Sequence, residues 1–329
     1  MKFLRVLFLS AFALLSFASC KSQFETLLNS TDGDEKYKAA MDFFDAGKYQ
    51  KAAQLFESLS VITNGTERSD TVQYYWGLSN YRYKDYYTAE TNFTNFIDHF
   101  PTSPFSEEAG FLRLDCLYRQ TYRYELDQTP THAAITSIEE FLKMYPNTTH
   151  SDLCNQMLKT LHARLDRKAY EDARLYYKME DYKAARVAFR NVLKDNSDNI
   201  YREDILYYIA MSSFKYAQKS VYSKQKERYF TFVDDYLNFV GEIPESPYRK
   251  ELDVVYKRAQ RALGKYSGSD KELDKKEKDF SKERKDLLNA RNQKLESEEN
   301  LQLPKVKKMK KSKNTSDSKK NETSGVRAE

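Results

Sequence analysis

Glycine and proline are scarce in this sequence, with nine Gly and seven Pro among 329 residues. This argues against a fold of many tight turns and favours helices joined by short connections. Cysteine is scarce too, and two of the three, Cys116 and Cys154, lie in apolar helical contexts. A free thiol there packs as a small hydrophobe, so we expect two unpaired core residues. The alternative is one disulfide in an oxidising compartment.

A basic face for nucleic acid is also missing. The formal net charge of +5 arises at the two ends, since residues 304–329 carry nine Lys/Arg against three Asp/Glu and residues 1–19 contain Lys2 and Arg5. The remainder is mildly acidic, and we expect no nucleic-acid partner. Residues 304–329 have almost no apolar side chains, which predicts a disordered basic tail.

Long apolar runs are absent after residue 18, and the one before it has the features of a secretory signal peptide, residues 1–19. Phe17-Ala18-Ser19-Cys20 resembles the bacterial lipobox, in which the cysteine thiol receives lipid. We therefore expect an acyl anchor on Cys20 followed by a linker, residues 20–33. The alternative is ordinary cleavage that leaves a free thiol. Lys21 is compatible with delivery to the outer membrane.

The body of the chain repeats the pattern Tyr-x-x-Ala-x-x-x-Phe three times. A small residue stands twelve positions before each alanine, at Ala40, Gly77 and Ala173. Close approach of two antiparallel helices requires small facing residues, so the pattern resembles the tetratricopeptide repeat. The three copies are Tyr49-Ala52-Phe56, Tyr86-Ala89-Phe93 and Tyr182-Ala185-Phe189.

A second recurring pattern marks the repeat ends, where an aromatic or aliphatic residue precedes Pro101, Pro146 and Pro244. Proline ends a helix, so the sequence predicts an all-α solenoid of about five tetratricopeptide-like helical hairpins over residues 34–266. The third and fifth hairpins are degenerate copies of the repeat, and the third contains an insertion. A further helix, from about residue 248, closes the array. The charged segment 267–303 is a candidate for an exposed helix stabilised by i,i+4 charge pairs.

The first helix of each hairpin lines a concave surface in tetratricopeptide arrays, and aromatic residues are frequent there in this chain. Counting from Ala40 and Gly77 predicts a peptide-binding groove on the first two repeats. The alternative is plain packing between repeats. The predicted groove residues are Tyr37, Met41, Phe44, Tyr74, Leu78, Tyr81 and Arg82.

Motifs for catalysis are absent from the sequence. None of the four histidines lies in a His-Glu-x-x-His arrangement, and His150 with Cys154 supplies fewer ligands than a structural zinc site needs. There is no glycine-rich phosphate loop and no Gly-x-Ser-x-Gly elbow. We therefore expect a binding protein with no metal or cofactor other than the lipid on Cys20.

Taken together, the lipobox, the five repeats and the aromatic-proline repeat ends resemble the BamD family. This family supplies the lipoprotein subunit of the outer-membrane β-barrel assembly machinery. The stretch Asp127-Gln128-Thr129-Pro130-Thr131-His132-Ala133 resembles the family's insertion in its third repeat. The resemblance covers about residues 17–265 and implies a non-catalytic scaffold on the periplasmic face of the outer membrane.

The resemblance also implies two partners. The later repeats would dock the periplasmic domains of the barrel-forming assembly protein, and the first repeats would receive the terminal segment of unfolded outer-membrane proteins. Repeat geometry alone suggests Arg174, Tyr177 and Lys215 as docking residues. The alternative function is another periplasmic tetratricopeptide lipoprotein, one that coordinates envelope constriction or peptidoglycan synthesis.

Overall fold

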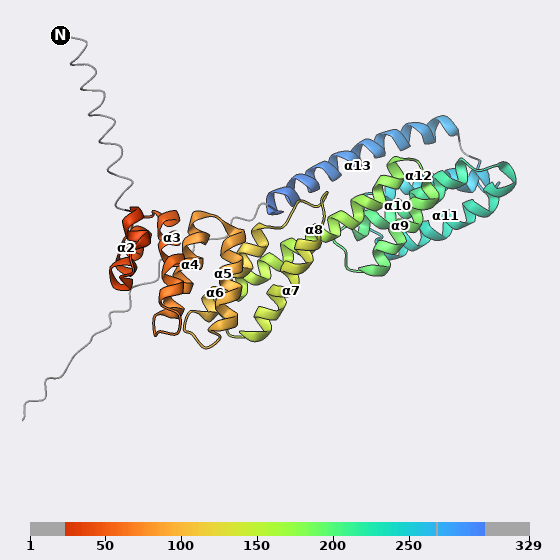
Figure 1. Ribbon diagram of the computed structural model, residues 1–329. Coiled ribbons are helices and arrows are strands. Elements are labelled where there is room, and N and C mark those ends of the chain that lie inside the picture. Colours follow the sequence, from red (N-terminus) through yellow and green to blue (C-terminus); the bar gives the residue numbers. More distant parts are fainter. Residues whose placement is uncertain (1–23, 268, 300–329) are drawn as a thin grey trace, which may run out of the picture.

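The computed structural model describes residues 24–267 and 269–299, and every regular element within them is a helix (Figure 1). The predicted signal peptide, the predicted lipidation site Cys20 and the predicted disordered tail lie outside these residues. The helices pair as antiparallel hairpins stacked along one axis, which confirms the predicted all-α repeat solenoid. The first three hairpins are α2 (Gly33–Asp45) with α3 (Tyr49–Ile62), α4 (Ser69–Tyr83) with α5 (Tyr86–His99), and α6 (Ser106–Arg119) with α7 (Thr129–Met144).

The C-terminal half continues the same stack and then reverses. After the predicted closing helix, the charged segment forms one long helix that runs back along the later repeats, in blue in Figure 1. The elements are α8 (Ser151–Lys178) with α9 (Tyr182–Asp195), α10 (Arg202–Gln218) with α11 (Tyr222–Glu242), the closing α12 (Arg249–Ala262), and α13 (Asp270–Glu299). Among the described residues, no helix has the length and apolarity needed to cross a membrane.

Small residues set the close approach inside each hairpin. Ala40 and Ala52 are fully buried where α2 meets α3. At Gly77 the approach is closer still, because a Cβ atom there would lie 2.9 Å from the Phe93 ring. A Cβ atom at Gly110 would likewise lie 3.0 Å from the Phe141 ring. The small residues are therefore needed for packing.

The turn inside three hairpins has the same backbone conformation. Gly47, Lys84 and Glu180 all have positive φ, and the last two are the non-glycine residues with positive φ in the described part of the chain. The aspartate that follows in the second and fourth hairpins caps the next helix, since Asp85 accepts from the Thr88 amide and Asp181 from the Ala184 amide. Repeated sequence thus produces repeated turn geometry.

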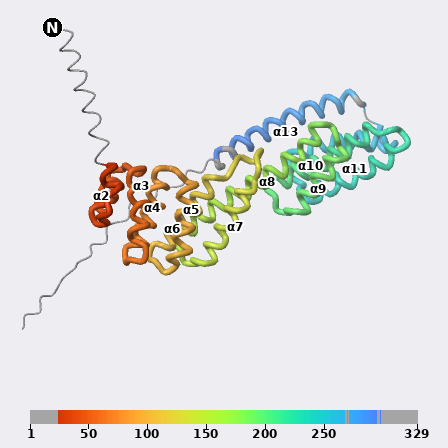
Figure 2. The backbone as a smooth tube through the Cα atoms, viewed as in Figure 1, coloured from red at the N-terminus to blue at the C-terminus, as the bar shows by residue number. Residues whose placement is uncertain are grey.

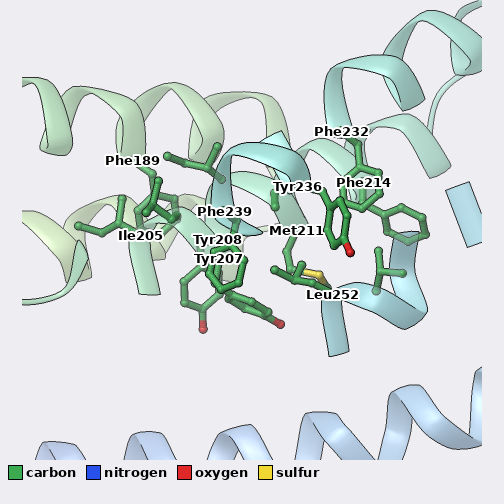
Figure 3. Packing of buried hydrophobic residues seen from close by; sticks show 14 of the residues in the cluster. Phe189, Ile205, Tyr207, Tyr208, Met211, Phe214, Phe232, Tyr236, Phe239 and Leu252 are labelled. Carbon is green, nitrogen blue, oxygen red and sulfur yellow. The ribbon is translucent and has the colours of Figure 1, made fainter. Parts of the chain in front are cut away.

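The apolar core is divided along α8. Cys154, Met157 and Leu161 pack with the third hairpin, whereas Tyr170 and Ala173 belong to the large C-terminal core drawn in Figure 3. Between these two stretches α8 carries buried polar residues. Arg164 donates to Thr121 Oγ1 at 2.6 Å, and Asp166 accepts from Asn196 Nδ2 at 2.7 Å. One continuous helix therefore joins two separate cores (Figure 2).

A short helix precedes the first hairpin. Residues 24–29 are helical, and Phe24 packs edge-on against Phe43 of α2 with ring centroids 5.7 Å apart. Part of the predicted linker is thus packed against the first repeat. Cys116 and Cys154 are buried and unpaired, as predicted.

Candidate functional site

The predicted groove on the first two repeats is corrected by the structure. Tyr74 is 2% exposed and Leu78 8% exposed, and both belong to the core of the second hairpin. The Tyr74 ring stacks on Phe105, with centroids 4.5 Å apart and planes 12° apart. Residues three or four positions from Gly77 share its face, and Gly77 faces α5. The residues predicted from the position of Gly77 therefore lie on the face of α4 that packs against its neighbours.

The other groove residues also contribute to packing. Tyr37, Met41 and Phe44 are half-buried against the core of the first hairpin. The Tyr81 hydroxyl donates to Asp115, which also accepts from Arg119 Nε at 2.7 Å. Arg82 is half-buried. The alternative reading of these aromatic residues, packing between repeats, is the one that the structure supports.

Exposed apolar side chains lie instead at the tips of the second and third hairpins. Tyr83 and Tyr87 flank the α4–α5 turn and are 50% and 65% exposed. Tyr122 and Leu126, in the connection from α6 to α7, are 43% and 51% exposed. The Tyr122 hydroxyl is hydrogen-bonded to Tyr87, so the two tips are adjacent. These four exposed residues are here called the tip patch.

A second surface lies on the later repeats. It is lined by tyrosines of α10 and holds two carboxylates that are nearly inaccessible, Asp204 at 1% and Glu251 at 3% exposure. Tyr201 stacks on Tyr170 with centroids 4.6 Å apart, which orients the ring rigidly. We call this surface the tyrosine–carboxylate face; its residues are Tyr201, Asp204, Tyr207, Tyr208 and Glu251.

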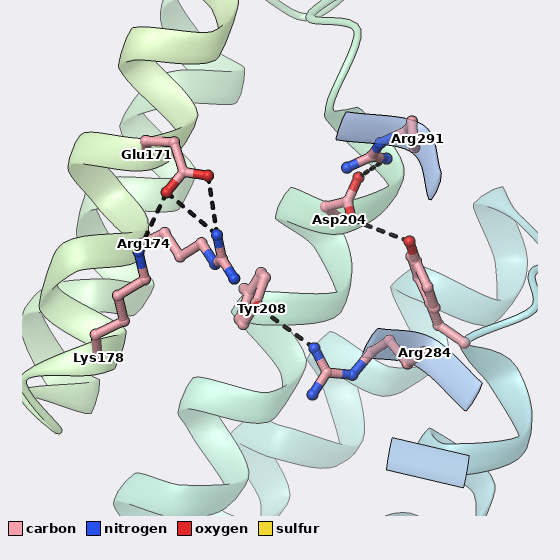
Figure 4. A network of polar contacts seen from close by, with 8 residues as sticks. Glu171, Arg174, Lys178, Asp204, Tyr208, Arg284 and Arg291 are labelled. Atoms are coloured by element: carbon pink, nitrogen blue, oxygen red, sulfur yellow. Dashed lines mark hydrogen bonds and ion pairs between the residues drawn. The ribbon is translucent and has the colours of Figure 1, made fainter. Parts of the chain in front are cut away.

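Two arginines of α13 cover this face (Figure 4). Arg284 Nε donates to Glu251 Oε2 at 2.9 Å and its Nη1 to the Tyr208 hydroxyl at 3.3 Å. Its guanidinium also lies 4.9 Å from the centre of the Tyr207 ring.

Arg291 repeats the arrangement two turns further along α13. It pairs with Asp204, and its guanidinium lies 4.9 Å from the Tyr201 ring centre. The Tyr248 hydroxyl donates to the same carboxylate at 3.1 Å. Each arginine thus meets one carboxylate and one aromatic ring, a geometry that suits its planar cation.

Burial affects the charge state of Glu251. It raises the pKa of Glu251 above its usual value, and the Arg284 guanidinium opposes this shift. A buried carboxylate that lost its arginine would be costly, because the desolvation penalty would remain uncompensated. The face therefore requires a cation opposite each carboxylate as long as it is covered.

The three predicted docking residues lie next to this face. Arg174 and Tyr177 line a pocket of about 330 Å³ together with Arg284 and Leu288. Lys215 Nζ lies 3.8 Å from Glu277 Oε1 of α13. The structure thus brings all three to one side of the later repeats, where α13 covers or contacts them.

The residues of α13 that make these contacts were not predicted from the sequence. The segment was taken as a solvated helix because charged residues dominate it. The spacing of its inward residues is nevertheless that of a packing helix, three or four positions apart. These residues are Leu273, Glu277, Phe280, Arg284, Leu288 and Arg291.

Within the described residues no group of three or more His, Cys, Asp or Glu side chains is placed to hold a metal ion. His150 and Cys154, noted in the sequence, serve separate purposes. The His150 ring stacks on Phe111 at 3.9 Å and contacts Glu108 at 3.0 Å, while Cys154 is a core residue.

Stacked helical hairpins define the class of solenoid repeat proteins, which use extended surfaces for binding. The family described as outer membrane lipoprotein, YfiO, matches residues 30–229, and the chain belongs to this family. The membership confirms the predicted location at the outer membrane through a lipid anchor.

The chain is also similar to a curated protein and to a solved structure. The outer membrane protein assembly factor BamD of Caulobacter vibrioides is 22% identical over 171 residues, which cover 52% of this chain and 56% of the relative. The chain therefore spans little more than half of that relative's length, and the match confirms the resemblance to the BamD family. A solved tetratricopeptide repeat protein from Parabacteroides merdae is 13% identical, with a TM-score of 0.29, covering 72% of this chain and 75% of the other.

Proposed function

We propose that the protein is a non-catalytic scaffold for outer-membrane protein assembly. The observation that carries the proposal is the family match over residues 30–229, which extends from the residues just before α2 into α11. The name of the Caulobacter relative, an outer membrane protein assembly factor, supports it. The hairpin stack has an exposed tip patch on the early repeats and, on the later repeats, a second surface that α13 covers.

In this proposal the anchor is the lipid on Cys20. Phe24, four residues further on, packs against Phe43, and Lys51 of α3 lies 5.1 Å from its ring. Four extended residues span about 14 Å, so the anchor would hold the first repeat close to the periplasmic face of the membrane. A Cys20→Ser variant is expected to leave the membrane fraction.

The tip patch is the proposed surface for unfolded outer-membrane clients. Its tyrosines are exposed, adjacent and suited to the aromatic residue at the end of such a client, because aromatic pairs add to the energy of area burial. Tyr83→Ser with Tyr87→Ser should weaken capture of barrel-protein C-terminal peptides at least fivefold. Tyr222→Ser, which removes a 92% exposed tyrosine from the fifth repeat, should have no effect. Equal loss in both variants would contradict the assignment of the patch.

Docking of the barrel-forming assembly protein is assigned to the later repeats. A gentle-detergent pull-down through a C-terminal tag, read by mass spectrometry, tests the whole proposal. Recovery of the barrel-forming protein at near-equal stoichiometry is the expected result. Recovery of peptidoglycan-synthesis or division proteins instead would support the alternative function and overturn this one.

A further inference from the structure

We propose that α13 is a removable cover on the tyrosine–carboxylate face, and that this face, once open, binds a partner helix with two arginines seven residues apart. The inference rests on the proposed function only for the origin of that helix, the barrel-forming assembly protein. The opening of α13 is a property of this chain alone.

The sequence pattern of α13 combines apolar and charged residues on its inward side. Its inward stripe has the spacing of a helix that packs on a surface, but arginine stands at two of the six positions. Arg284 and Arg291 are separated by two helical turns, so both project to the same side. The carboxylates that meet them, Glu251 and Asp204, come from α12 and α10 and are matched to this spacing. The face is thus built to recognise a helix by its arginines.

Polar contacts hold most of α13 in place. Leu273 and Leu288 are the buried apolar side chains among its described residues, and its other contacts are ion pairs, a hydrogen bond to Tyr208 and cation–π contacts. Besides the two arginine pairs, Glu277 Oε2 lies 3.0 Å from Arg258 Nη2. Buried ion pairs fix register, but they repay little more than the cost of removing both charges from water. The cover is therefore specific in position and weakly held.

An incomplete hydrogen-bond shell weakens the cover further. Arg291 Nε and Nη2 are buried and have no hydrogen-bond partner among the described residues. A buried donor without an acceptor keeps its full desolvation cost. A partner helix whose own arginine found acceptors for all of its donors opposite Asp204 would bind better than α13 and displace it.

α13 is separate from the apolar cores of the fold. The core clusters of the solenoid are assembled from α2 to α12, and α13 contributes no member to them. The family match ends at residue 229, before α12 and α13. Release of α13 therefore uncovers the face and leaves the hairpin packing intact. It also frees Arg174, Tyr177 and Lys215, which line or contact its underside.

The test compares the full-length protein with its Arg284→Ala/Arg291→Ala variant. Hydrogen exchange read by mass spectrometry should show loss of protection over residues 270–294 in the variant, with an unchanged melting temperature. Lys275→Ala/Lys282→Ala is the matched control, because it removes two exposed lysines of α13 at the same seven-residue spacing. This control should keep the protection of the wild-type chain.

A labelled synthetic peptide of residues 270–294 then serves as the probe for the open face. It should bind the Arg284→Ala/Arg291→Ala protein at least tenfold more tightly than the wild-type protein, whose own α13 competes. The same peptide carrying both arginine-to-alanine changes should not bind.

Three results would overturn the inference: unchanged protection of α13, a melting temperature that falls with its release, or equal binding of the two peptides. None of these measurements depends on the barrel-forming protein. A failed pull-down would therefore contradict the proposed function but would not contradict the inference that α13 is a removable cover.

Discussion

Arg186 of α9 and Asp235 of α11 form a two-bond ion pair between the fourth and fifth repeats. Arg186 Nε donates to Asp235 Oδ2 at 2.6 Å and its Nη2 to Oδ1 at 2.9 Å. Asp235 is buried, and it also accepts from Arg190 at 3.0 Å and from Ser213 of α10. One carboxylate thus connects three helices.

Replacement of this carboxylate should be strongly destabilising. Asp235→Ala leaves Arg186 without its partner and Ser213 without its acceptor, and breaking a buried pair costs about 3–5 kcal/mol. Urea unfolding measures the loss. Asp234→Ala, which alters the exposed neighbour, should change the stability by less than about 0.5 kcal/mol. A small loss for both variants would show that solvent reaches Asp235.

Gly77→Ala should destabilise the protein although alanine is the better helix former. The added Cβ would lie 2.9 Å from the Phe93 ring and 3.3 Å from Asn92 Cβ, so α4 and α5 must separate. Overpacking costs about 1–3 kcal/mol, against a gain in helix propensity of about 1 kcal/mol. Gly241→Ala is the control, since nothing lies within 4 Å of its Cβ position, and it should be neutral or stabilising. A higher melting temperature for both variants would contradict the argument.

Tyr74→Ala should behave as a core substitution. The side chain is buried and stacked on Phe105, and loss of a buried aromatic ring costs about 3–5 kcal/mol. A lowered melting temperature with unchanged capture of client peptides by the remaining folded protein is expected. The reverse outcome, intact stability with lost capture, would restore the groove predicted from the sequence.

The two core thiols should be unreactive in the folded protein. Burial raises the pKa of Cys154 to about 11 and raises that of Cys116 further, with the Asp115 carboxylate adding to the second shift. At pH 8 about one Cys154 thiol in a thousand would be ionised, and the thiolate is the reactive form. Alkylation at pH 8 should therefore leave both unmodified until denaturant is added. Rapid labelling of either one in native buffer would show that its helix opens locally.

The fold could be predicted because it depends on local sequence patterns. The functional surfaces depend on contacts between residues that are far apart in the sequence. Ala40 and Ala52 are twelve residues apart, so the hairpin that they allow is visible in a short window of sequence. The aligned turn residues Gly47, Lys84 and Glu180 likewise have one conformation. Both features depend on neighbours in the chain, which explains why the repeats could be predicted.

The surfaces could not be predicted in the same way. Periodicity finds the apolar side of α4 but does not say whether another helix covers it, and Tyr74 was therefore assigned to a groove. The contact between Arg291 and Asp204 joins residues 87 positions apart. No local pattern contains such a pair, and a segment rich in lysine and glutamate has the composition of a solvated helix whether or not it packs.

The unbroken course of α8 has a mechanical consequence. Its 28 residues form a rod of about 42 Å that is embedded in one core at its start and in another at its end. A stiff helix fixed at both ends transmits tilt and torque without melting between them. A force applied where the third hairpin contacts a bound protein would therefore tilt the later repeats as one rigid unit. The lipid anchor would be the fixed point of this movement.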